Sequence, residues 1–252
     1  MDMSKFETKR YRFIVVLFAI GGLTASSTAV SDIQHINELF QSNTVYAQEA
    51  NELQLTLRPA YLTNANGDQW LMPIEVEYGI TDALQVEAEW LVYARDDPNM
   101  EPPVDGIGDF SIGALYSWLN LGGMPLHVAI ALQVAFDVGD DDLEINEEGT
   151  VWEPSLVVAS RPDYLMGIEA FIEIGGEISS EESETFYNIG GYRAFGYQFL
   201  SLEFNHREKE RYLTPGITRR WQNGWEAGIG VPVGLNDDSD DFRVIFLIIY
   251  ES

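Results

Sequence analysis

Residues 124–139 alternate between two kinds of side chain with a period of two. Every second residue is large and apolar, and most of those between are alanine or polar. The apolar set is Leu126, Val128, Ile130, Leu132, Val134, Phe136 and Val138. This alternation predicts a β-strand with two different environments. In a soluble sheet the apolar face would meet a protein core, whereas in a membrane barrel it would meet lipid and the polar face would line the interior.

Strand-like segments separated by turn signals recur from residue 52 to the end of the chain, without a long helix. Short connections alternate with connections that are mostly longer and charged, which is typical of outer-membrane barrels. The sequence therefore predicts an all-β fold, a single-chain transmembrane antiparallel up-and-down β-barrel with both termini periplasmic. The expected twelve strands are 52–62, 70–80, 83–95, 107–120, 124–138, 150–160, 164–178, 184–194, 197–206, 212–221, 224–235 and 241–250.

The composition excludes several functional classes. The 252 residues carry a formal net charge of −27, which excludes nucleic acid as the main partner. The absence of cysteine excludes a disulfide framework and thiolate chemistry. The three scattered histidines, His35, His127 and His206, do not form a zinc cluster. We therefore expect neither a metal nor another cofactor.

An enzymatic barrel is disfavoured by the surroundings of the histidines. Outer-membrane lipid hydrolases place a histidine and a serine two residues apart on one strand face, so that the base reaches the hydroxyl. Here Ala129 follows His127 at that offset, and Glu208 follows His206. We therefore expect no catalytic residues and interpret His127 as a polar residue of the barrel interior.

The N-terminus has the pattern of a secretory signal. The basic residues Lys9, Arg10 and Arg12 precede the apolar run 13–23, which is short for a membrane span. A short membrane anchor is the alternative. The expected signal covers residues 1–29, with cleavage after Ala29 or as late as Ala47.

With cleavage after Ala29, residues 30–50 would precede the barrel as a periplasmic segment, and the barrel would cover residues 51–252. Within that segment, residues 32–42 place four apolar side chains on one helical face and predict a short helix. These side chains are Ile33, Ile36, Leu39 and Phe40.

Charged and polar residues alternate with the apolar face and are the candidates to line the lumen. Two interpretations stay open: an ion-pair network that fills a narrow barrel, or an acidic water path that prefers cations. Arg58 and Arg243 are expected to be neighbours because the first and last strands pair in a closed barrel. The lumen candidates are Arg58, Glu75, Glu77, Glu87, Glu89, His127, Gln133, Glu169, Glu173, Glu203, Arg220, Glu226 and Arg243. The alanines of 124–139 alternate with the apolar residues and would leave room in the lumen. Any passage through the barrel is therefore expected to be widest beside them.

Aromatic residues gather near the strand ends on the apolar face. Two such girdles are expected where a barrel meets the two membrane interfaces. The alternative is the general preference of strands for aromatic residues. The girdle candidates are Trp70, Tyr78, Trp118, Trp152, Tyr164, Trp225, Phe242 and Tyr250.

Two turn motifs carry a resemblance to a known family. A Tyr-Gly-Ile-Thr-Asp turn covers residues 78–82, and Gly106, Gly108 and Asp109 open the next strand. The chain resembles the phenol-degradation meta-pathway (MetA-type) outer-membrane transporter family, loosely along the whole barrel. The resemblance implies a single-chain barrel that transports small solutes, hydrophobic or aromatic ones among them. It implies no catalytic residues.

The expected function is passive transport of a small-molecule solute across the outer membrane of a Gram-negative cell, after export by the signal peptide. Outer-membrane lipids, lipopolysaccharide and the barrel-assembly machinery are the expected partners. The alternatives are a structural or adhesive barrel with a closed lumen, a membrane-embedded lipid hydrolase, and a soluble sandwich or lipocalin-like protein.

Overall fold

The computed structural model describes residues 35–140, 142–143, 149–180 and 183–252. The predicted signal over 1–29 therefore lies outside the described residues. Helix is limited to two short 3-10 turns in the described chain, η1 (Leu121–Gly123) and η2 (Pro162–Tyr164). Within these residues, no helix has the length and apolar character needed to cross a membrane.

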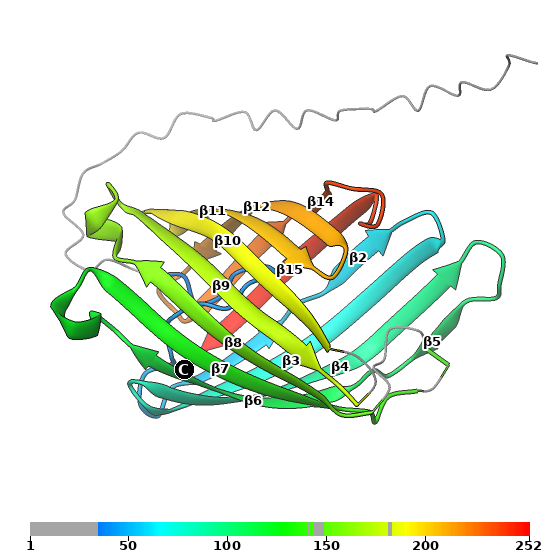
Figure 1. The fold of residues 1–252 in the computed structure, drawn as a ribbon, viewed down its shortest axis with the longest axis horizontal. Coiled ribbons are helices and arrows are strands. Elements are labelled where there is room, and N and C mark those ends of the chain that lie inside the picture. The colour runs from blue at the N-terminus through cyan, green and yellow to red at the C-terminus, as the bar shows by residue number, and fades with distance from the viewer. Residues whose placement is uncertain (1–34, 141, 144–148, 181–182) are drawn as a thin grey trace, which may run out of the picture. The chain divides into compact units, whose positions relative to one another are not determined.

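The rest of the described chain forms one antiparallel sheet that closes into a barrel (Figure 1). Closure occurs because β1 pairs with both β3 and β15. Three strands are each made of two segments, so the barrel has the predicted twelve strands. The segments are β1 Leu53–Leu57, β2 Ala60–Thr63, β3 Gly67–Thr81, β4 Leu84–Pro98, β5 Val104–Gly106, β6 Phe110–Trp118, β7 Leu126–Phe136, β8 Val151–Ser160, β9 Ile168–Ile178, β10 Ser183–Phe195, β11 Gln198–Arg207, β12 Glu210–Arg220, β13 Trp225–Gly230, β14 Val233–Gly234 and β15 Phe242–Glu251.

The first strand is interrupted at Arg58 and Pro59, between β1 and β2. Proline lacks the N–H that a strand interior needs, so it occurs at breaks and edges. The neighbouring strands still bond across this break: Phe246 N–H donates to the Pro59 carbonyl (2.8 Å), and Arg58 N–H to the Pro73 carbonyl (3.1 Å). The wall therefore stays closed.

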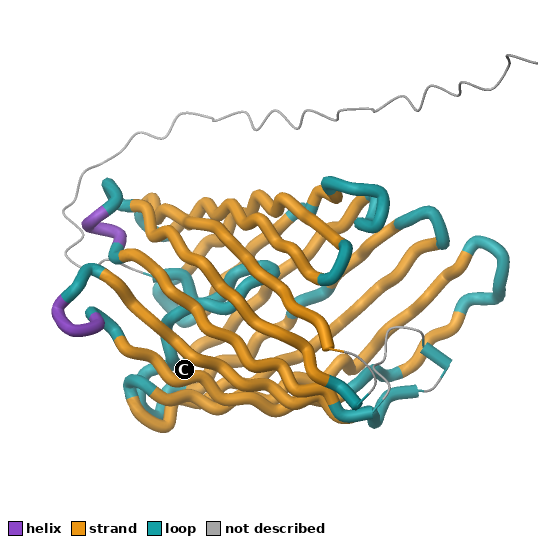
Figure 2. Tube along the Cα trace, in the orientation of Figure 1, coloured by secondary structure: helices purple, strands orange, loops and turns teal. Residues whose placement is uncertain are grey.

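The two ends of the barrel differ in their connections (Figure 2). Both 3-10 turns lie at one end, with the tight turn between β3 and β4. At the other end, the strands predicted over 197–206 and 212–221 leave a five-residue connection over 207–211, and this prediction is wrong. Only Glu208 and Lys209 separate β11 from β12, because the two strands extend farther than predicted. Glu208 has φ 52°, a left-handed conformation suited to such a tight turn.

Exposure follows the predicted alternation. In β9, Ile172 is 49% exposed, whereas Glu173 is 1% exposed. The apolar side chains therefore point outward and the polar ones inward, the arrangement expected for a sheet surrounded by lipid. The predicted girdle residues are all exposed, seven on strands and Tyr164 in the turn η2: Trp70, Tyr78, Trp118, Trp152, Tyr164, Trp225, Phe242 and Tyr250. Their depth in a bilayer stays a prediction.

The barrel is filled by residues 35–50, here called the inner segment, which lie within the ring of strands (blue in Figure 1). The expected short helix is wrong for the described part of 32–42, which has no helical residue. Its apolar side chains contact two different regions of wall: Ile36 and Leu39 pack near Phe199, and Phe40 packs against β15. A helix with one apolar face cannot make both contacts. In place of helical hydrogen bonds, the backbone N–H groups of Phe40 and Gln41 donate to the wall residue Glu203.

We predict that Ile172→Arg destabilises the barrel in lipid vesicles. An arginine on the lipid face near the bilayer middle costs about 2–4 kcal/mol of unfolding free energy. Urea unfolding of the refolded variant measures this loss. The control is Met100→Arg, at a position 98% exposed beyond the end of β4, which should change stability by less than about 0.5 kcal/mol. Equal effects of the two substitutions would contradict lipid contact at Ile172.

Candidate functional site

The lumen candidates all lie on the face opposite the exposed apolar side chains. The structure gathers Glu75, Glu77, Glu87 and Glu89 around Arg58. Beneath the inner segment lie Glu169, Glu173 and Glu203, and Arg220 pairs with Glu226. Apart from these groups, His127 accepts a hydrogen bond from the Asn120 N–H, Gln133 donates to Ser111, and Arg243 pairs with Asp240.

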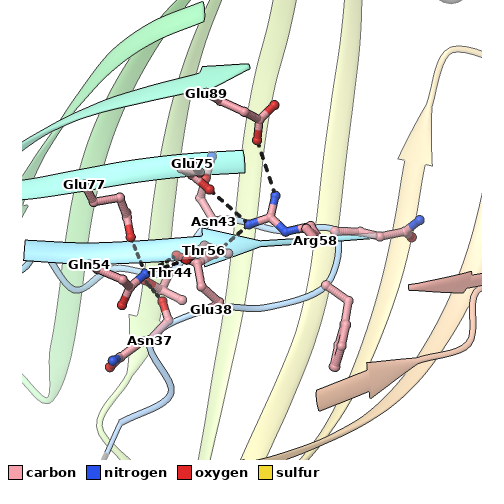
Figure 3. Close-up of polar contacts among 12 residues, drawn as sticks. Asn37, Glu38, Asn43, Thr44, Gln54, Thr56, Arg58, Glu75, Glu77 and Glu89 are labelled. Carbon is pink, nitrogen blue, oxygen red and sulfur yellow. Dashed lines mark hydrogen bonds and ion pairs between the residues drawn. The ribbon is translucent and has the colours of Figure 1, made fainter. Parts of the chain in front are cut away.

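Arg58 holds the first group together (Figure 3). Its Nη2 lies 2.8 Å from Glu38 and 3.3 Å from Glu75, and its Nη1 lies 3.7 Å from Glu89. Glu77 is linked to the group through Gln54, which also donates to Glu38 (3.1 Å). One guanidinium thus serves three carboxylates directly. The carboxyl groups of this cluster outnumber its single guanidinium.

Glu38 belongs to the inner segment, and the sequence reasoning missed it. Burial, together with the nearby Glu75 carboxylate, raises the pKa of Glu38 to about 8 against the opposing effect of Arg58. The carboxyl is therefore held near its protonated form at neutral pH. The available signal was an acidic residue among the apolar ones of 32–42. It would have identified Glu38 only if this segment had been placed inside the barrel.

Carboxylate oxygens of Glu75, Glu77 and Glu87 lie within 4.8 Å of one another, as do those of Glu177, Glu184 and Glu208. Carboxylates this close repel one another, and either a cation or a proton would relieve the repulsion. No other feature of the described residues there favours a metal over protonation.

The second group of carboxylates bonds to the inner segment. Glu203 accepts from the backbone N–H of Phe40 (3.0 Å) and Gln41 (3.1 Å) and from the Ser42 hydroxyl (2.8 Å). The next carboxylate, Glu173, accepts from both the backbone and side-chain N–H of Asn43.

The same group continues at Glu169, which accepts from the Tyr46 hydroxyl at 2.6 Å. Within the described chain none of Glu169, Glu173 and Glu203 forms an ion pair with a basic residue. Neutral donors therefore satisfy these buried carboxyl groups, and no basic side chain of the described residues pairs with them.

Phe40 sits in a notch of the inner wall made by three glycines. A Cβ added at Gly216 would lie 2.2 Å from the Phe40 ring, and one at Gly230 would lie 2.5 Å from it. Gly228 would place a Cβ at 3.1 Å. The other side of the notch is the inner face of β15, formed by Ile245, Leu247 and Ile249. The ring therefore fits only because these wall positions lack side chains.

Sequence reasoning also missed this apolar part of the interior. In β15 both faces are apolar, with Phe246 and Ile248 outside and Leu247 and Ile249 inside. A strand that departs from polar–apolar alternation was the available signal, because an apolar inner face needs a partner within the lumen.

Two expectations about the interior are wrong. Arg58 and Arg243 are not brought together, because the register pairs Leu57 with Ile248 and Arg243 with Leu62. The two arginines are separated by four residues along the wall, about 13 Å at the rise of a strand. The passage expected beside the alanines of 124–139 is filled: Ala129 is 0% exposed and packs in the same cluster as Ile36, Leu39 and Val45.

No family model and no curated protein matches the chain. Solved structures match its fold. The COG4313 outer-membrane channel from Pseudomonas putida F1 superposes with a TM-score of 0.64 over 84% of this chain and 99% of that chain, at 10% identity. The KdgM porin in complex with disordered oligogalacturonate gives a TM-score of 0.56 over 79% and 97%, at 6% identity.

The β domain of the Bordetella autotransporter BrkA also matches, with a TM-score of 0.50, 13% identity, and coverage of 80% of this chain and 99% of that domain. The fold is that of an outer-membrane barrel. At these identities the likeness concerns the fold alone, so the family resemblance of the two turn motifs stays a prediction.

We predict that Glu203→Gln loosens the inner segment. A neutral amide is a weaker acceptor than a carboxylate for the three donors at this site, and its N–H₂ meets donors instead of acceptors. The loss is about 1–3 kcal/mol. Hydrogen exchange at the amides of Phe40 and Gln41 reports it. The exposed loop variant Glu101→Gln is the control, and unchanged protection in Glu203→Gln would contradict the role of this carboxylate.

We also predict that docking of the inner segment weakens as the pH rises. Glu38 has a raised pKa in the docked state, about 8 against 4.5 for the free group, so the docked state binds more protons. Docking is fully favoured below about pH 4.5 and loses this contribution as the pH approaches 8.

The charged groups facing Glu38 are Arg58, Glu75, Glu77 and Glu87. Because the chain has no cysteine, Thr44→Cys carries a single spin label whose mobility reports docking. Its mobility should rise between pH 5 and 8 in the parent and stay constant in a Glu38→Gln background. The same pH response in both backgrounds would assign it to another group.

Proposed function

We propose that this protein is a passive channel for small solutes in the outer membrane, with an acidic interior that the inner segment closes at rest. The closed twelve-strand barrel with apolar outside and charged inside supports a membrane-spanning role. The observation that carries the proposal is the imbalance of ionisable groups on the inner wall: one guanidinium, Arg58, lies among the carboxyl groups of Glu75, Glu77, Glu87 and Glu89. Such an interior favours cations over anions.

Location and partners are part of the same proposal. The named outer-membrane channel and porin share the fold and support an outer-membrane location in a Gram-negative cell. Export by the N-terminal signal, insertion by the barrel-assembly machinery and contact with lipopolysaccharide follow from that location. The family resemblance adds hydrophobic or aromatic molecules to the solutes to be tested.

One observation favours a second candidate, a structural or adhesive barrel with a closed lumen. The inner segment packs against the wall with Ile36, Leu39 and Val45 each at most 2% exposed. A permanently docked segment would leave no path for solutes. The two candidates differ in whether removing the segment exposes a conducting barrel.

Single-channel recording in planar bilayers separates them. The parent should conduct weakly, and both deletion of residues 36–46 and Leu39→Gln, which puts a polar group in the buried contact, should raise the conductance. Heat-modifiable gel migration verifies that each variant has folded. Folded variants that do not conduct would contradict the channel and support the closed barrel.

Ion selectivity tests the acidic interior. In the deletion variant, Glu75→Gln combined with Glu87→Gln should lower the cation-to-anion permeability ratio, because the fixed negative charge is removed. Reversal potentials in a salt gradient measure the ratio. Glu101→Gln, at an exposed loop position, is the control and should leave the ratio unchanged. An unchanged ratio in the double variant would exclude this carboxylate group from the conduction path.

A further inference from the structure

The notch that holds Phe40 is shaped for a flat ring. Gly216 and Gly230 leave space that a Cβ would fill, since it would lie 2.2 and 2.5 Å from ring atoms. On the other side, Leu247 and Ile249 are 0% exposed and give an apolar surface. An apolar cavity of this kind in a protein binds small aromatic molecules when its own side chain is removed.

Two hydroxyls at the notch have no hydrogen-bond partner within the described chain, those of Ser201 and Thr218. Both residues are buried, at 8% and 1% exposure. A Cβ added at Gly216 would lie 2.6 Å from Ser201 Oγ, and one at Gly228 would lie 2.7 Å from Thr218 Oγ1. The hydroxyls therefore face the space that the ring occupies.

The Thr218 hydroxyl lies toward the tip of the ring. A Cβ added at Gly228 would lie 2.7 Å from Thr218 Oγ1 and 3.1 Å from Phe40 Cζ. Cζ is the ring atom opposite the attachment point. A phenylalanine offers this hydroxyl no hydrogen bond, and a buried hydroxyl without a partner is costly. A ring with a para-hydroxyl would provide the missing partner.

A carboxylate lies at the opposite end of the same residue. Glu203, 0% exposed, accepts the backbone N–H of Phe40 at 3.0 Å. Within the described residues, no basic side chain forms an ion pair with Glu203. The atoms from the Phe40 backbone nitrogen through Cα and Cβ to the ring are the skeleton of an arylethylamine. A free arylethylamine would put an ammonium group where Phe40 offers only a neutral amide.

We propose that the Phe40 notch is a binding site for arylethylamines with a para-hydroxyl group, which becomes free when the inner segment withdraws. The ring would lie between the glycines and β15, the hydroxyl would bond to Thr218, and the ammonium group would pair with Glu203. The proposal deepens the proposed function, because it names a solute class for the same interior.

Deletion of residues 36–46 and Leu39→Gln test the site, because withdrawal of the inner segment frees both the notch and Glu203. Tyramine binding to the detergent-solubilised protein is measured by calorimetry. Each folded variant should bind tyramine at least roughly tenfold more tightly than the parent, in which Phe40 occupies both the notch and Glu203. The anion 4-hydroxyphenylacetate, with the same ring, should not bind.

Second substitutions in the background of the 36–46 deletion assign the contacts. Glu203→Gln should weaken tyramine binding roughly tenfold, as expected for loss of a charge-assisted hydrogen bond. Thr218→Val, close in shape to threonine, should remove the advantage of tyramine over phenethylamine. Gly230→Val should fill the notch and abolish binding, and gel migration shows whether it folds.

No tyramine binding to either folded variant, or binding that survives both Glu203→Gln and Thr218→Val, would overturn the site. The binding measurement needs no conduction through the barrel. Binding without conductance would therefore refute the proposed channel and support the site. Conductance without binding would refute the site and support the channel.

Discussion

The structure depends on the pairing of its first strand with its last. Residues 54–57 of β1 face residues 248–251 of β15, and this contact turns an open sheet into a barrel. A sheet surrounded by lipid must close, because its edge N–H and C=O groups have no water to bond to. Once it is closed, every strand has only two sides, and the period-two alternation sends each side chain either to the outer surface or to the interior.

Closure creates a second requirement inside the barrel. Glu169, Glu173 and Glu203 are buried there, and buried carboxylates need hydrogen-bond donors. The inner segment supplies them from its backbone and from neutral side chains. It therefore stabilises the barrel through neutral donors and not through ion pairs.

Much of the barrel could be predicted from the sequence because its signal is local. The alternation in 124–139 identifies the strand β7 and its two faces without knowledge of any other strand. The content of the lumen could not be predicted in this way. Phe40 is apolar in a short pattern that also fits a helix, and its partners Gly216 and Ile249 are about two hundred residues away in sequence.

The sequence alone determined the strand number and, for most strands, which side is apolar, because these follow from residue type and spacing. Only the tertiary structure decided the register that separates Arg58 from Arg243, and the docking of residues 35–50 where an open passage was expected. Both depend on contacts between distant parts of the chain. A period of two carries no information about register or about which segment fills the interior.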